Sequence, residues 1–207
     1  MRILNLYAGI GGNRKLWSEH SVLAVEIDPI IAKCYQDNFP DDEVVIEDVI
    51  QFVEENDLSR FDVIWASPPC LTHSQWNMIN GAKVPRVTDI YGLILFFNHT
   101  RREPWVIENV NPWYKTLIPR SFQIGRHYFW SNYHLPSKRY GPSKINFRSF
   151  RQLSREYDLN VKRIEKLTQL RRRQIVRNCV HPEIGKYILE NLTGENRLLE
   201  YLTENDA

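Results

Sequence analysis

The sequence has little cysteine and no long apolar run. Its 207 residues contain three cysteines, Cys34, Cys70 and Cys179, too few for a disulfide framework in a chain of this size. No stretch approaches the roughly 20 consecutive apolar residues that a membrane span requires, and the N-terminus does not have the form of a signal peptide. We therefore expect reduced thiols in a cytoplasmic protein with no membrane contact.

Internal repeats, low-complexity segments and a linker are also missing. The composition is 43% hydrophobic, 12% aromatic and 25% charged, a balance that can bury a core. It excludes a disordered tail, a coiled coil and a collagen-like fibre. The sequence predicts a single catalytic domain over residues 1–207.

Charge is distributed unevenly along the chain. Residues 134–177 contain 13 Lys and Arg against three Asp and Glu, whereas the remainder contains 14 against 22. This contrast predicts an acidic body with a basic insertion that contacts nucleic acid, although a solvated helix face is the alternative. The cations that we expect to meet nucleic acid are Lys162, Arg163, Arg171, Arg172 and Arg173.

Strand patterns and helix patterns alternate from residue 2 to about residue 110. Short apolar strands are expected near residues 2–8, 21–28, 42–49, 61–69 and 104–110, with helices between them. This alternation predicts an α/β fold, a Rossmann-like, doubly wound and mostly parallel sheet. Beyond it, the patterns predict an aromatic hairpin from residue 122, a basic helix in the insertion, and a closing amphipathic helix within residues 178–207.

Residues with a plausible chemical role follow the predicted strands. Gly9, Gly11 and Gly12 come after the first strand, where glycines let a ligand approach the backbone. Glu26 ends the second strand, where a carboxylate can accept from both ribose hydroxyls. Asp48 ends the third and can accept from an adenine amino group. The ordered set predicts an adenosine cofactor, although the glycines alone also suit an ordinary tight turn.

A thiol and an acid follow the next two strands. Two prolines precede Cys70 and hold it rigidly at a strand end, whereas Cys34 and Cys179 are expected to be structural. Glu108 ends the fifth strand, where a buried carboxyl can keep its proton; a salt-bridged acid is the alternative. Together they indicate pyrimidine chemistry: Cys70 adds to carbon 6, Glu108 protonates ring nitrogen 3, and carbon 5 takes a methyl group from a sulfonium donor.

The motifs LNLYAGIGG, VEID, EDV, SPPCLTHS, ENV and RNCVHPEIGKYIL, in this order, resemble those of DNA cytosine-5 methyltransferases. The resemblance covers residues 3 to about 110, and more loosely about 178 to 192. It implies an S-adenosylmethionine-dependent methyltransferase fold, with S-adenosylmethionine as the cofactor and no metal. By the same resemblance, the cofactor-binding residues are Tyr7, Gly9, Gly11, Gly12, Glu26, Ile27, Asp48, Val49, Pro69, Asn178 and Val180.

Two motifs depart from the family pattern. The family arginine that contacts the cytosine carbonyl corresponds to Arg126, but QIGRHYFW differs from Gln-x-Arg-x-Arg. His127 is a candidate replacement for one residue of that pattern, or the aromatic run RHYFW belongs to the core. RNCVHP differs from the family's Gly-Asn-Ala/Ser-Val-Pro-Pro, and this is the motif through which Asn178 is assigned to the cofactor site.

The resemblance implies duplex DNA as the substrate, with the target cytosine flipped out of the helix. Gln75, Trp76 and Asn77 are candidates to fill the gap, or they form an ordinary surface loop. Only about 45 residues stand where the family carries a target-recognition domain, so a separate specificity subunit is a possible partner. A phage or restriction-modification setting would suit the compact form. RNA, a cytidine nucleotide, and a DNA-binding subunit without activity of its own stay as alternatives.

Overall fold

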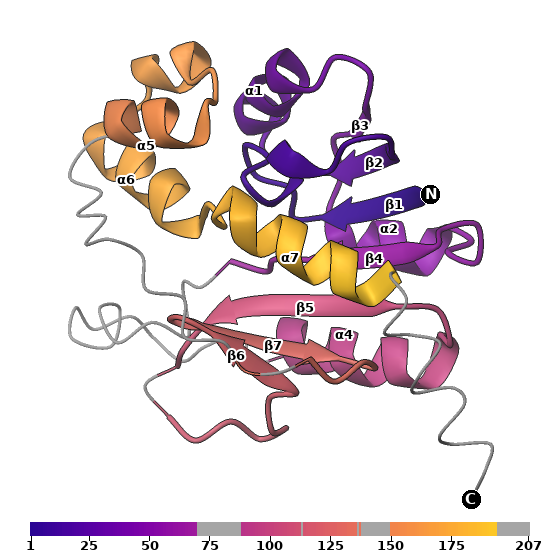
Figure 1. Ribbon diagram of the computed structural model, residues 1–207. Helices are drawn as coiled ribbons and strands as arrows, with labels where there is room; N and C mark the ends of the chain where they lie inside the picture. The colour runs from indigo at the N-terminus through magenta and orange to yellow at the C-terminus, as the bar shows by residue number, and fades with distance from the viewer. Residues whose placement is uncertain (70–87, 113, 136, 138–149, 194–207) are drawn as a thin grey trace, which may run out of the picture.

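The computed structural model describes residues 1–69, 88–112, 114–135, 137 and 150–193. Within them, one sheet of seven strands has helices on both faces (Figure 1). The strands are β1 (Arg2–Leu6), β2 (Ser21–Val25), β3 (Glu43–Val45), β4 (Val63–Ala66), β5 (Trp105–Val110), β6 (Phe122–Ile124) and β7 (His127–Ser131). The helices are α1 (Pro29–Asn38), α2 (Val49–Glu55), α4 (Thr88–Thr100), α5 (Phe150–Tyr157), α6 (Gln169–Asn178) and α7 (Pro182–Thr193), with 3-10 segments η1 (Asn13–Leu16) and η3 (Lys162–Lys166).

The sheet is doubly wound and mostly parallel, as predicted. Its order is β3-β2-β1-β4-β5-β7-β6. The strands β1 to β5 pair in parallel, with Leu6 of β1 opposite both Val25 and Ala66. β7 runs antiparallel to β5 and β6. The predicted hairpin turns at Gly125, whose φ of +57° suits a residue without a side chain.

Apolar side chains cover both faces of the central strands, as in a sheet buried between helices. Leu4 and Leu6 of β1 belong to a core with α2 and α4. Ile3, on the other face, belongs to a core with Trp17 and α7. Figure 1 shows α7 crossing the face opposite α4. None of the helices in the described ranges has the length and apolarity to cross a membrane.

The predicted basic helix is instead two helices, α5 and α6, joined through η3. The chain leaves α5 at Asp158, whose φ is +49°. Next to it, Tyr157, Leu159 and Val161 are all buried in a core shared with α1. They alternate with polar residues, a period of two that a continuous helix cannot bury on one face. Residues 138–149 of the predicted insertion lie outside the described part of the chain.

The predicted apolar face of the closing helix is buried in α7. Ile184, Ile188, Leu189 and Leu192 are each at most 4% exposed. The helix lies so close to η1 that a methyl group on Gly185 would come within 2.2 Å of the Asn13 carbonyl oxygen. Residues 194–207 lie outside the described part.

We expect Gly185→Ala to lower the free energy of unfolding by about 1–3 kcal/mol, because the added carbon meets backbone that cannot move aside. Urea denaturation measures this change. Gly92→Ala is the matched control: Gly92 is also in a helix but has open space at this position. That variant should be more stable by about 0.5–1 kcal/mol. Equal effects of the two substitutions would contradict the close contact.

Candidate active site

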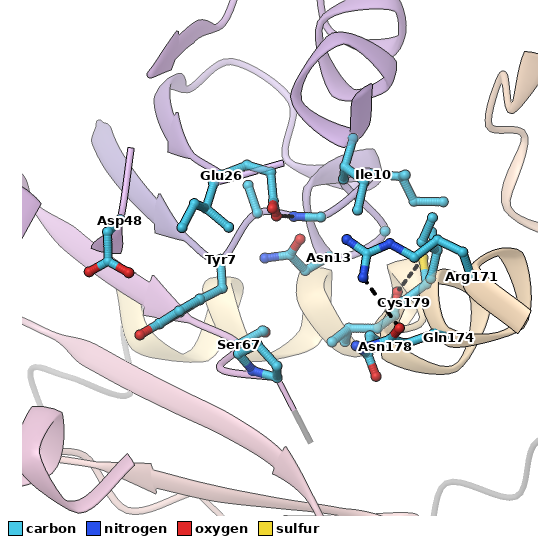
Figure 2. Close-up of a pocket in the computed structure, with 18 of the residues that line it drawn as sticks. Tyr7, Ile10, Asn13, Glu26, Asp48, Ser67, Arg171, Gln174, Asn178 and Cys179 are labelled. Atoms are coloured by element: carbon cyan, nitrogen blue, oxygen red, sulfur yellow. Dashed lines mark hydrogen bonds between the residues drawn. The ribbon is translucent and has the colours of Figure 1, made fainter. Parts of the chain in front are cut away.

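A cavity of about 530 Å³ opens beside the glycine-containing loop that follows β1 (Figure 2). It lies at the carboxyl ends of β1, β2 and β4, the edge where parallel α/β sheets bind ligands. The opposite wall comes from α6 and the residues that follow it. The lining residues with polar side chains are Tyr7, Asn13, Glu26, Asp48, Ser67, Arg171, Gln174, Asn178 and Cys179.

The loop after β1 has left-handed backbone at three positions. Tyr7, Gly9 and Gly11 have φ values of 54°, 57° and 83°, a region that favours glycine. Gly12 lies against the opposite wall, since a Cβ there would be 2.3 Å from the Cys179 sulfur. Gly9 has open space where a Cβ would stand, so a ligand can approach the backbone closely there.

Glu26 joins this loop to the turn after β2. Its Oε2 accepts from the Gly9 amide and its Oε1 from the Asp28 amide, both at 3.0 Å. The side chain is nearly buried at 9% exposure. Burial raises the pKa of Glu26, while the two amide hydrogen bonds oppose that rise. Each carboxylate oxygen accepts more than one hydrogen bond, so Glu26 retains capacity to accept from a ligand.

Asp28 joins the end of β2 to α6. Its Oδ1 accepts from the amides of Ile30 and Ile31 and caps α1. Its Oδ2 forms an ion pair with Arg171 Nη2 at 2.7 Å. Burial favours the neutral form of Asp28, but the Arg171 hydrogen bond and the two amides outweigh it and lower the pKa of Asp28. Figure 2 shows Arg171 reaching along the cavity from α6.

Asp48 and Ile27 form the outer part of the cavity. Asp48 caps α2 through Oδ1, which accepts from the amides of Ile50 and Gln51. The Ile27 side chain is 60% exposed although it is apolar. This exposed apolar surface beside an acceptor is suited to the flat face and the amino edge of a heterocyclic ring.

The cavity brings together nine of the eleven residues predicted to bind the cofactor. These nine are Tyr7, Gly9, Gly12, Glu26, Ile27, Asp48, Pro69, Asn178 and Val180. The structure does not bring Gly11 or Val49 to the wall. Gly11 faces the Phe39 ring, which an added Cβ would approach to 2.1 Å. Val49 is 2% exposed and belongs to the core beneath α2.

A second polar cluster lies where β5 meets β7. Glu108 and His127 are 5% and 7% exposed, and Glu108 Oε1 is 2.5 Å from His127 Nδ1. They line a small cavity that also includes Arg177. Arg126 lies at the exposed turn before His127, and its Nη2 donates to the Arg177 carbonyl at 3.2 Å. Of the predicted catalytic residues, Glu108 is thus buried and Arg126 is at the surface.

A side chain of β5 holds the backbone that leads to the predicted nucleophile. Asn109 Nδ2 donates to the Pro68 carbonyl at 2.8 Å, and this hydrogen bond is buried. It fixes the backbone two residues before Cys70. Cys70 itself and residues 75–77 lie outside the described residues.

The five predicted nucleic-acid contacts have different surroundings. Lys162 and Arg173 are exposed. Arg163 forms an ion pair with a carboxylate of α1, and Arg172 lies over an aromatic ring of α5 at 4.9 Å. Arg171 lines the large cavity.

Sequence reasoning missed four contributions to the site. Arg171 and Gln174 were not expected in the cavity wall, although the resemblance already placed Asn178, the last residue of the same helix, at the cofactor site. The contact of Asn109 with Pro68, and that of His127 with Glu108, depend on strand pairing. The only available signal was position, because both Asn109 and His127 fall at strand ends on neighbouring strands.

Comparison with known proteins covers the first half of the chain. The model of a family described as C-5 cytosine-specific DNA methylase matches residues 1–117. This segment contains β1 to β5, and with them the glycine loop, Glu26 and Glu108.

The relatives match the same part. The Type II methyltransferase M2.BsuMI of Bacillus subtilis (strain 168) is 34% identical over 117 residues, 53% of this chain and 29% of that protein. The tRNA (cytosine(38)-C(5))-methyltransferase of Mus musculus is 27% identical over 118 residues, 53% of this chain and 28% of that protein. The crystal structure of S. pombe Dnmt2 methyltransferase aligns with a TM-score of 0.40 and 21% identity, covering 53% of this chain and 34% of that one. The matching segment thus spans less than a third of the two curated relatives.

Two thiols of the chain should be unreactive in the folded protein. Burial raises the pKa of Cys34 to about 11 and that of Cys179 to about 12, so at pH 8 about one Cys34 thiol in a thousand is a thiolate, and fewer at Cys179. We expect iodoacetamide at pH 8 to leave both unmodified under native conditions and to alkylate both in urea, as read by mass spectrometry. Rapid native alkylation of either one would contradict its buried position.

Proposed function

The chain belongs to the C-5 cytosine-specific DNA methylase family, and from this premise we propose that it transfers a methyl group from S-adenosylmethionine to carbon 5 of cytosine in DNA. The observation that carries the proposal is the junction of two cavities at one sheet edge. Ser67 and Asn178 line both the large cavity, which contains Glu26, and the small one, which contains Glu108. A methyl donor in the large cavity would face a base that approaches Glu108 at this edge.

The large cavity has a donor set that fits S-adenosylmethionine. Glu26 is a buried acceptor at a strand end, the place from which a carboxylate binds ribose hydroxyls. Ile27 would pack on the adenine and Asp48 would accept from its amino group, while Asn178 and Val180 would close round the methionine part. When bound, the cofactor supplies an electrophilic methyl group on a positively charged sulfur.

The protein's own residues would activate the base. Cys70, as thiolate, adds to carbon 6 of the cytosine, and Glu108 donates a proton to ring nitrogen 3, which makes carbon 5 nucleophilic. Once carbon 5 is methylated, loss of its remaining proton expels the thiolate. Asn109 supports this chemistry by holding the Pro68 carbonyl and thus the approach to Cys70.

The basic segment supports a nucleic acid as the substrate. Lys162 is exposed on η3 and Arg173 is exposed on α6. Arg171, which is also on α6, lines the large cavity. Phosphate contacts from such residues position a duplex without reading its sequence. The target base would leave the stack to reach Glu108, at a cost of a few kcal/mol. A second polypeptide that recognises the base sequence of the DNA would supply the target specificity.

RNA is the second candidate substrate, because one relative is a tRNA (cytosine(38)-C(5))-methyltransferase. The same residues would perform the same chemistry on an unpaired cytosine of a loop, which needs no flipping from a duplex. Salt dependence is expected for both polymers, so only a direct assay separates them.

Glu26→Ala should weaken S-adenosylmethionine binding by about 1.5–3 kcal/mol, the scale of losing hydrogen bonds to a buried charged acceptor. Isothermal titration calorimetry measures the affinity. Glu43→Ala is the control, because Glu43 is an exposed carboxylate on β3 outside the cavity. Urea denaturation without cofactor shows whether the loop still folds. An unchanged dissociation constant in a folded Glu26→Ala protein would place the cofactor elsewhere.

Cys70→Ala should abolish methyl transfer and leave cofactor binding nearly intact. Tritium-labelled S-adenosylmethionine is incubated with duplex DNA, single-stranded DNA, tRNA or cytidine nucleotides, and the product is analysed for 5-methylcytosine. Cys34→Ala is the matched control, since it removes a thiol from a packed position and should retain turnover. Label in tRNA alone would replace DNA by RNA as the substrate. Full turnover by Cys70→Ala would exclude the covalent mechanism.

A further inference from the structure

The antiparallel pairing of β5 and β7 places an imidazole beside the candidate acid. Glu108 is opposite Phe129, and His127 is opposite Val110, so Glu108 and His127 are diagonal neighbours on one face of the sheet. Diagonal pairs lie within reach of long side chains. The resulting contact joins His127 Nδ1 to Glu108 Oε1 at 2.5 Å.

The neighbouring arginine determines which imidazole nitrogen carries the proton. Arg126 Nε is 3.4 Å from His127 Nε2. A guanidinium has only donors and does not lose its proton in proteins, so Nε2 accepts in this contact and carries no hydrogen. The proton of a neutral imidazole is then on Nδ1, where it is donated to Glu108.

Cationic and titratable groups also face the pair. Arg126 contacts the imidazole, and Arg177 of α6 lines the same small cavity. His181, at the start of α7, also interacts electrostatically with His127. Cys179, whose pKa is raised to about 12 by burial, stays a neutral thiol.

We propose that His127 is a positioning residue for Glu108, and that Arg126 acts through it. His127 donates its Nδ1 hydrogen to Oε1, which orients the carboxyl group and directs Oε2 toward the base. This inference rests on the proposed function and assigns Arg126 a role different from contact with the cytosine carbonyl.

The proton balance follows from this arrangement. Before reaction, Glu108 carries a proton on Oε2 and accepts from His127 on Oε1. As the thiolate adds to carbon 6, the Oε2 proton passes to ring nitrogen 3, and the carboxylate formed stays hydrogen-bonded to Nδ1. When carbon 5 loses its proton to solvent water and the thiolate leaves, ring nitrogen 3 returns its proton to Glu108. His127 keeps its Nδ1 hydrogen throughout.

The test compares a replacement that keeps the donor with one that removes it. In His127→Asn the side-chain amide takes the place of Nδ1–H, whereas His127→Leu has no donor. We expect kcat to fall by about 100-fold in His127→Leu, within the range for lost acid–base assistance, and to recover at least tenfold of that loss in His127→Asn. KM for S-adenosylmethionine should not change. His99→Leu and His99→Asn are matched controls at an exposed histidine in the last turn of α4.

A measurement without substrate tests the tautomer directly. Nitrogen-15 NMR of the unaltered protein should show His127 protonated at Nδ1 and unprotonated at Nε2, and Arg126→Met should mix the two tautomers. A proton on Nε2, or equal kcat values for the Leu and Asn variants, would overturn the inference. An unaltered protein that methylates none of the nucleic acids, while its His127 tautomer is as assigned, would instead contradict the proposed function.

Discussion

The carboxylate of Glu26 closes the loop after β1 onto the turn after β2, and the rest of the site depends on this closure. Its two oxygens accept from the amides of Gly9 and Asp28, so this one side chain satisfies a backbone donor on each side of the cavity edge. The carboxylate thereby links the loop with left-handed backbone to the turn after β2. A single acid thus organises the backbone that surrounds the cavity and also presents an acceptor to it.

The described part of the basic insertion, residues 134–177, has two roles in the structure. Its apolar side chains pack on α1, and α6 supplies one wall of the large cavity. Through the ion pair of Arg171 with Asp28, the helix is joined to the end of β2. The part of the chain with the highest positive charge is therefore structural as well as exposed. A polyanion bound along α6 would lie on the same helix that lines the cavity.

Much of the fold was predictable because it depends on local patterns. Apolar runs ending in acids placed Glu26 and Asp48 at the sheet edge, and the structure confirms that both line one cavity. The rest depends on pairing between distant segments. The contact of His127 with Glu108 requires the register of β5 against β7, and the position of Arg171 requires α6 to lie against the turn after β2. Neither appears in the spacing of nearby residues.

The tight contact at Gly12 has a consequence for how the protein is made. Gly12 emerges from the ribosome early, but Cys179 and Val180, against which it packs, are synthesised more than 160 residues later. The cavity gains its second wall only when α6 is complete, and α7, which covers one face of the sheet, follows α6 in the chain. The complete cavity is therefore restricted to chains whose synthesis has passed this point.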